Sequence, residues 1–485
     1  MLNLGWVRRC PPPPGTHDAA GRRRDIGTGE LIRDIAGSPS AALHRAARWA
    51  RLGRPLEALA LLEAAGRAGP DHPLRLRLYA ALQLYRPLLE ATGGGVVVPA
   101  RLRPELGLAR LATGDPEGAI PLLEQAIRGR PRWGAWMRAA AALASIAPER
   151  AEPALAQCRQ GPLVRLVRAH LAERAGEYRR ALALLPEAEA GEGRPAEAAL
   201  LRATALAGLG ERDAAERAVA GALAGFALPP FADEPSSRQD GPVVTVVVAA
   251  FDAEATIETA LRSLQRQSWR SLDIVVVDDA STDRTAAITA ALTARDSRIR
   301  LLRQPINRGA YAARNRGLAE AVGEYVTTHD ADDEAHPLRI ERQLAPLLAD
   351  ARLVGTVARW LRREAPNRFR DRQLAPLIRL HVGSLLLRRR FLVGAVGAYD
   401  EVRYGADGDL LTRIDAAAGA GGIARLALPL TVSGVRAGSA VHDPLSGYGG
   451  RGYSLERQRY HERSVLRCIA QLCGRPLTIS HDLPE

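Results

Sequence analysis

The chain has 485 residues, which is too long for one typical hydrophobic core and predicts two or three domains. Its net charge of +13 would favour nucleic-acid binding if the cations were clustered, but all 67 basic residues are arginine and spread from end to end, so we expect no nucleic-acid partner. Four cysteines without zinc-ligand spacing, and no apolar run of the roughly 20 residues that span a membrane, predict a soluble cytoplasmic protein with at most peripheral membrane contact.

Residues 1–38 hold four consecutive prolines and an arginine triplet without a helical or strand period, so we expect a flexible leader. From 39 to 228, apolar residues recur at helical spacing. Glycines in short turns recur there at separations of 61, 62 and 34 residues, which are close to one or two units of about 34: Gly53, Gly114, Gly176 and Gly210.

This period resembles that of tetratricopeptide repeats, in which each helix pair exposes an apolar face that its neighbour covers. The resemblance implies a helical repeat domain that could bind a protein partner or an acceptor. An irregular helical bundle with coincidental spacing is the alternative.

A linker rich in proline and serine is expected at 229–242. After it, from 243 to 446, β-branched runs alternate with helical segments, which predicts an α/β domain with a doubly wound, mostly parallel sheet. Ligands of such sheets gather at the carboxyl ends of the strands. Polar clusters follow three predicted strands, at 251–254, 278–283 and 330–333.

Three ordered motifs resemble the family 2 glycosyltransferases of the GT-A fold: VTVVVAAFDAEATIETALRSLQRQS from Val244, LDIVVVDDASTDRT from Leu272 and NRGAYAARNRGLAEAVGEYVTTHDADDEAHPLRIERQ from Asn307. The likeness covers about residues 243–435. It implies a Rossmann-like sheet, a nucleoside-diphosphate sugar donor, and a glycan, lipid-linked or protein acceptor. It also implies an inverting transfer assisted by Mg²⁺ or Mn²⁺.

The nucleotide side of this site is expected around the first two clusters. Phe251 could stack on the base, with core packing as the alternative, and Glu254 closes the same cluster. Asp279 could accept the imide hydrogen of the base, with Asp278 as its neighbour. By the resemblance, Arg314 faces the nucleotide and could grip ribose or phosphate oxygens, while a solvated helical arginine is the alternative.

The third cluster crowds carboxylates that repel one another unless a cation or water offsets the charge. The resemblance assigns Asp330 and Asp332 to the metal, with Asp332 as the direct ligand and Asp330 also contacting ribose. Asp333 either assists them or caps the helix expected from Pro337. A third ligand is either His442 or absent.

An acceptor hydroxyl needs a base that takes its proton. By the resemblance, Asp407 is that catalytic base, Asp409 is the second choice, and a helix cap is the alternative for both. Residues 447–485 are expected to form a helical C-terminal extension.

Two other functions are alternatives to a glycosyltransferase. Ala249 and Ala406 stand where the family has other residues, so a non-catalytic tetratricopeptide scaffold with a degenerate nucleotide-sugar-binding module is the alternative function. A sugar nucleotidyltransferase would need a glycine-rich phosphate loop and usually a lysine, and the chain has no lysine.

Overall fold

The computed structural model describes most of the chain: residues 16–17, 23–24, 39–66, 68–93, 99–129, 133–185, 195–235, 237, 239–371, 374, 376–419, 421–434 and 454–474. Of the predicted leader, β1 (Thr16–His17) and β2 (Arg23–Arg24) pair antiparallel and the rest lies outside the described residues. His442 also lies outside them.

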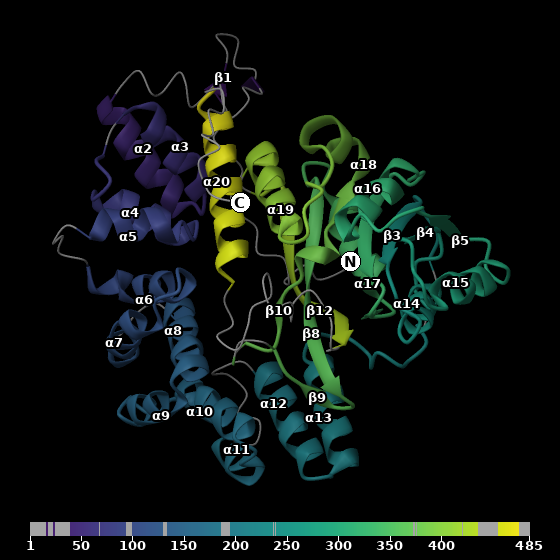
Figure 1. The fold of residues 1–485 in the computed structure, drawn as a ribbon, viewed down its shortest axis with the longest axis horizontal. Helices are drawn as coiled ribbons and strands as arrows, with labels where there is room; N and C mark the ends of the chain where they lie inside the picture. Colours follow the sequence, from purple (N-terminus) through teal and green to yellow (C-terminus); the bar gives the residue numbers. More distant parts are fainter. Residues whose placement is uncertain are drawn as a thin grey trace.

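The N-terminal half is helical, as predicted, and in the described residues it consists of six consecutive helix pairs (Figure 1). The pairs are α2 (Pro39–Arg51) with α3 (Pro55–Ala64), α4 (Pro73–Ala81) with α5 (Tyr85–Thr92), α6 (Arg103–Ala112) with α7 (Pro116–Arg128), α8 (Trp133–Ile146) with α9 (Pro148–Ala156), α10 (Pro162–Arg174) with α11 (Tyr178–Leu184), and α12 (Pro195–Gly208) with α13 (Arg212–Ala224). We call this region the helical array. Its tetratricopeptide-like character stays a prediction.

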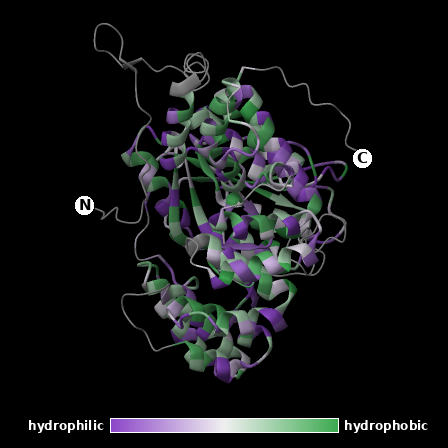
Figure 2. Cartoon of the chain, turned by 90° about the vertical axis from the view of Figure 1, so that its left-hand side faces the viewer, coloured by the Kyte–Doolittle hydropathy of each residue, from purple (hydrophilic) through white to green (hydrophobic). Residues whose placement is uncertain are grey.

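The four glycines used to find the period all lie in the turn inside a helix pair. Gly53, Gly114, Gly176 and Gly210 have φ between 74° and 93°, the left-handed region that favours glycine. The other two pairs, α4 with α5 and α8 with α9, fall inside the long intervals, which therefore contain two units each. Each helix carries both hydrophobic and hydrophilic residues, as expected of stacked amphipathic helices (Figure 2).

The second half is built on a ten-stranded sheet, and its first part is parallel. The strand order there is β5 (Ile299–Arg303), β4 (Leu272–Asp278), β3 (Val244–Ala250) and β6 (Tyr325–Asp330). The connecting helices are α14 (Ile257–Gln265), α15 (Thr285–Thr293) and α16 (Ala310–Ala319), and α17 (Arg339–Ala349) follows β6 and β7. All seven residues of β4 are buried, which explains its apolar run from Ile274 to Val277.

The rest of the sheet is mixed. β11 (Leu386–Arg388) runs antiparallel to both β6 and β8 (Gly355–Ala365), β12 (Ile423–Gly434) runs parallel to β8, and the short β7 (Asp333–Ala335) closes that edge antiparallel to β12. Two short strands, β9 (Arg368–Phe369) and β10 (Arg379–Leu380), also pair with β8. Helix α19 (Ala406–Ala418) precedes β12.

The C-terminal helix α20 (Leu455–Leu472) packs on both halves, against α3 on one side and α19 on the other (Figure 1). One continuous hydrophobic core contains residues of the array, of α20 and of the chain after β8. Among the described residues, no helix combines the length and apolar character needed to cross a bilayer. The domain boundaries given above stay a prediction.

Candidate active site

The carboxyl ends of β3, β4 and β6 lie side by side. In the sheet register, Ala250 at the end of β3 pairs with Asp278, and Ala249 pairs with Asp330. The three polar clusters of the sequence therefore meet at one edge, as a parallel sheet requires. This edge is the candidate active site.

Asp278 and Asp279 are both buried and engaged by the protein. Asp279 accepts hydrogen bonds from the main-chain N–H groups of Arg308 and Gly309, at 2.9 and 2.8 Å, and from the Gln304 amide at 2.6 Å. These bonds fix the loop before α16. Asp278, which is fully buried, accepts from the Arg303 guanidinium at 3.2 Å. Contact of Asp279 with a base stays a prediction, while its loop-fixing role is directly visible.

The first cluster divides into an exposed ring and a structural carboxylate. The Phe251 ring is 43% exposed at the end of β3, so the alternative of core packing is wrong and a face is free for stacking. Glu254 accepts from the main-chain N–H of Arg284 at 3.1 Å, and its own N–H donates to Asp283 at 2.9 Å. Glu254 thus ties the end of β3 to the start of α15, and its predicted ligand contact is untested.

Arg314 of α16 is buried and its guanidinium donates to the carboxylate of Asp330. The alternative of a solvated arginine is therefore wrong. The guanidinium also lies over the rings of Tyr311 and Tyr399, 5.2 and 5.8 Å from their centroids. Burial has the largest single effect and raises the pKa of Asp330, but the charge and hydrogen bond of Arg314, together with the nearby His381 and His329, outweigh it and hold this pKa at about 2. Asp330 is therefore a carboxylate at neutral pH.

Asp407 lies in the first turn of α19, where the positive end of the helix dipole favours a carboxylate. Its Oδ1 accepts a hydrogen bond of 3.0 Å from the hydroxyl of Tyr311. Burial, followed by the negative charge of Asp407, raises the pKa of Tyr311 well above its ordinary value, so this hydroxyl stays protonated and donates. Through Tyr311 and Arg314, contacts connect Asp407 to Asp330 across about 80 residues of sequence.

Asp409, the second choice for the base, is 3% exposed and fully engaged. Its two carboxylate oxygens accept from Ser464 at 2.6 Å and from Arg413 at 2.7 Å, and Arg467 lies 3.3 Å away. The geometry favours Asp407, which is only half-buried, as the residue that a substrate could reach.

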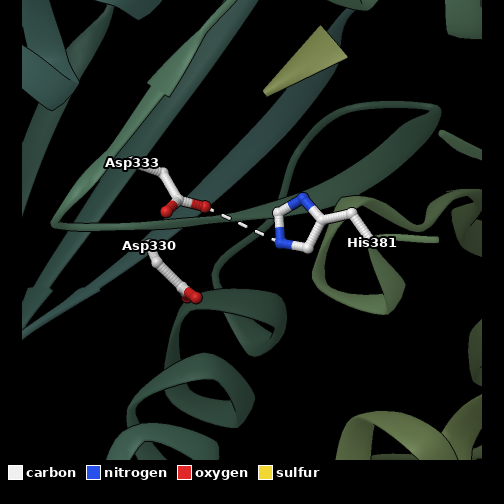
Figure 3. A group of neighbouring side chains, drawn as sticks. All are labelled: Asp330, Asp333 and His381. Atoms are coloured by element: carbon white, nitrogen blue, oxygen red, sulfur yellow. Dashed lines mark ion pairs between the residues drawn. The ribbon is translucent and has the colours of Figure 1, made fainter. Parts of the chain in front are cut away.

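One group of side chains in the described residues could hold a metal ion: Asp330, Asp333 and His381 (Figure 3). One ligand atom from each lies within 4.8 Å of the others. Asp332, the ligand named from sequence, is half-buried in the turn between β6 and β7 and is not a member of this group. Asp333 is in β7 and does not cap α17, which begins at Arg339 without a side-chain cap, so the capping alternative is wrong.

The polar atoms of this group fit a cation. Both oxygens of Asp333 are buried without a hydrogen bond of normal geometry to the described residues, although the Ser433 hydroxyl approaches Asp333. His381 Nε2 lies 3.7 Å from Asp333 Oδ2, and its ring stacks on Trp360 at 4.6 Å. Buried polar atoms without partners are rare, and carboxylate oxygens are the ligands that Mg²⁺ and Mn²⁺ prefer.

The charges around the group point the same way. Burial, and then the negative charges of Asp330 and Asp332, raise the pKa of Asp333 well above its ordinary value. Burial lowers the pKa of His381 to about 3, which keeps the imidazole neutral and its lone pair available. Buried Arg339 of α17 supplies a nearby positive charge, and its guanidinium donates to His329 Nδ1 at 2.8 Å.

Sequence reasoning missed His381 and Tyr311. Nothing local in the sequence distinguishes His381 from a core histidine. Tyr311 stands in the same motif as Arg314, at a spacing of three residues that places both on one helix face, and this was the available signal.

The half-parallel sheet with an acidic carboxyl edge has the arrangement expected of the GT-A fold. Residues 245–415 match the family model described as Glycosyl transferase family 2.

Individual relatives are similar over shorter stretches. The chain is 41% identical over 103 residues to the succinoglycan biosynthesis protein ExoO of Rhizobium meliloti, a match that covers 21% of this chain and 29% of that protein. It is 38% identical over 94 residues to the GalNAc(5)-diNAcBac-PP-undecaprenol beta-1,3-glucosyltransferase of Campylobacter jejuni, covering 19% and 30%. The crystal structure of S. aureus TarS in complex with UDP aligns at 18% identity and a TM-score of 0.36, over 50% of this chain and 67% of that one. The chain covers less than half the length of the curated relatives that it matches.

Proposed function

We propose that the protein is a metal-dependent, inverting glycosyltransferase that moves a sugar from a nucleoside-diphosphate sugar to an acceptor hydroxyl. The single observation that carries this proposal is the meeting of Asp330, Arg314 and Asp407 at one edge of a family 2 domain. The acceptor is a glycan, a lipid-linked sugar or a protein.

The nucleotide would bind over the ends of β3 and β4. The exposed ring of Phe251 offers a stacking face for the base, and Asp279 and Asp278 stiffen the loops on either side. Arg314, held charged by Asp330, would offer its guanidinium to ribose or phosphate oxygens. Because this arginine is buried and its rotamer is already fixed, its side chain would lose little conformational entropy when a ligand binds.

Asp330 and Asp332 are the metal ligands proposed from the motif, and the unpartnered oxygens of Asp333 and the neighbouring His381 support an extension of this set. A bound Mg²⁺ or Mn²⁺ would offset the charge on the diphosphate as it leaves. Manganese binding to Asp332→Asn and Asp333→Asn separates the two sets. The variant with the larger loss of affinity identifies the stronger ligand.

In the reaction, the acceptor oxygen forms a bond to the anomeric carbon while the bond from that carbon to the phosphate oxygen breaks. The electron pair leaves with the nucleoside diphosphate, and the hydroxyl proton passes to Asp407. Tyr311 donates to Oδ1 of Asp407, which orients the carboxylate and leaves Oδ2 for the proton. Attack from the face opposite the leaving group inverts the anomeric centre.

The direct test incubates the protein with Mn²⁺ and a panel of nucleotide sugars and measures release of nucleoside diphosphate, with and without sugar acceptors. Turnover with one donor and its loss on chelation are expected. Absence of both turnover and binding with every donor would reject the proposal and favour the non-catalytic scaffold.

A further inference from the structure

The helical array reaches the active site through the segment between β9 and β10, which leads directly into His381. Two main-chain N–H groups of this segment, those of Leu377 and Ile378, donate hydrogen bonds to the carboxylate of Glu197 in α12. Glu197 is 1% exposed. A buried glutamate of the array therefore fixes the main chain three residues before a member of the candidate metal group.

Further polar contacts hold the same segment to α10 and α12. The main-chain N–H of Phe369 donates to the Thr204 hydroxyl at 3.0 Å, Arg370 pairs with Glu173 at 2.7 Å, and Arg174 donates to the carbonyl of Asp371. The strand β9 lies beside α12 in the fold (Figure 1). The array thus contacts the described part of the segment near both of its ends.

Apolar packing supports these bonds. Phe369, Leu374, Leu377 and Ile378 are each at most 5% exposed, and they belong to the hydrophobic core that joins the array, α20 and residues of β8 and β12. The segment would lose part of its packing without the array.

A second connection runs through α20. Glu462 accepts hydrogen bonds from the main-chain N–H groups of Tyr85 and Arg86, at 2.8 and 3.0 Å, and so caps the first turn of α5. Two residues further along α20, Ser464 donates to Asp409, which lies in the first turn of α19 beside Asp407. Helix α20 therefore ties the array to the helix that carries the proposed base.

A pocket of about 300 Å³ separates part of the array from α19, and its lining includes Glu57 of α3, Thr412 of α19 and His461 of α20. Helix α20 contacts both α3 and α19 and so connects the array to α19.

We infer that the helical array is a positioning element for the active site, on the metal side through His381 and on the acceptor side through Asp407. Glu197 positions His381, and Glu462 positions Asp407 through α20 and Asp409. The inference rests on the proposed function for the roles of His381 and Asp407. It gives the repeats an internal task, in addition to the partner binding predicted from sequence.

The first test measures Mn²⁺ affinity of the full chain by isothermal titration calorimetry, without any sugar donor. Glu197→Gln places an amide N–H against a main-chain N–H, so Mn²⁺ binding should weaken about tenfold. The matched control is Glu105→Gln, because Glu105 of α6 is also buried but pairs with Arg138 inside the array. It should change the affinity less than about twofold.

Thr204→Val removes only the hydroxyl that accepts from Phe369, and it should weaken Mn²⁺ binding about threefold. It keeps the test informative if Glu197→Gln does not fold. Affinities of Glu197→Gln or Thr204→Val equal to that of the control would overturn the inference, as would absence of Mn²⁺ binding by the unmodified protein.

The second test separates kcat from KM. Glu462→Ala removes the oxygen Oε1 that accepts from both main-chain N–H groups, so it should lower kcat about tenfold. It should leave the donor KM within about twofold, because the donor side does not depend on α19. Glu456→Ala is the control, since Glu456 is half-buried on the same helix and pairs locally with Arg459. An active unmodified protein whose Glu462→Ala variant has normal kcat overturns the inference. An unmodified protein with neither turnover nor donor binding overturns the proposed function instead, while the Mn²⁺ test still decides the inference for Glu197.

Discussion

The helical array and the sheet domain treat buried acidic groups differently. In the array, Glu57 pairs with Arg54 at 3.0 Å, and Glu197 accepts two main-chain N–H groups. At the carboxyl edge of the sheet, Asp333 is just as buried, yet neither of its oxygens makes a hydrogen bond of normal geometry to the described residues.

The difference separates a structural task from a chemical one. A buried carboxylate with partners offsets its desolvation and fixes neighbouring chain, whereas one without partners raises the energy of the protein until a ligand arrives. In our proposal, the array therefore stabilises the fold and positions the active site, and the sheet edge binds the metal ion and the donor.

The largest effect is expected at Asp407. Replacing it by Asn removes the proposed base, so kcat should fall by about 10²–10⁴-fold while donor affinity stays within about twofold. Steady-state kinetics and donor titration measure the two quantities. Asp415→Asn is the control, because Asp415 lies two turns further along α19 and pairs with Arg425 at 2.6 Å. Equal activity of the two variants would contradict a catalytic role for Asp407.

His381→Asn tests whether the buried group at the sheet edge binds a metal ion, since it removes the neutral imidazole of that group. Mn²⁺ affinity should fall about 10–100-fold, and the Mn²⁺ concentration for half-maximal activity should rise accordingly. His44→Asn, an exposed change in α2, should leave both unchanged. Unaltered Mn²⁺ affinity in His381→Asn would mean that the imidazole is a packing group against Trp360.

His336 is a buried group of the sheet domain that, unlike Asp333, has hydrogen-bond partners, Pro229 and Leu338. Burial lowers its pKa to about 4, below the ordinary 6.5. The neutral form therefore stabilises the fold above pH 6.5, and this stability is lost as the pH falls toward 4. Between pH 7 and 4, unmodified protein should lose roughly 2–3 kcal/mol more than His336→Asn. Parallel pH slopes in denaturant titrations would contradict this.

The smallest effects come from two helical glycines, one in each region. A Cβ on Gly317 of α16 would stand 2.3 Å from a methyl of Val247 in β3, so Gly317→Ala should destabilise by about 1–3 kcal/mol. A Cβ on Gly221 of α13 would meet no atom of a neighbouring described residue within 4 Å, so Gly221→Ala should stabilise the protein by about 0.5–1 kcal/mol. Thermal unfolding measures both, and a shift of the same sign in both would show that packing of α16 on the sheet is looser than the structure describes.

The helices and strands, and the edge of the sheet where the polar clusters meet, could be predicted from local patterns in the sequence. Hydrophobic periodicity is a local property, so the strand of Val244–Ala250 and the turn at Gly114 could be recognised without coordinates. Parallel strands place their carboxyl ends together, so the meeting of Asp278 with Asp330 also followed.

Which side chains of that edge have partners could not be predicted in this way, because it depends on contacts between separate elements. The burial of Arg314 against Asp330, the approach of His381 to Asp333, and the capping of α5 by Glu462 all join residues from separate elements, the last pair 377 residues apart. Such contacts depend on how helices and strands pack in three dimensions. No local pattern in one sequence encodes that packing, because each partner satisfies its own local preferences equally well with or without the other.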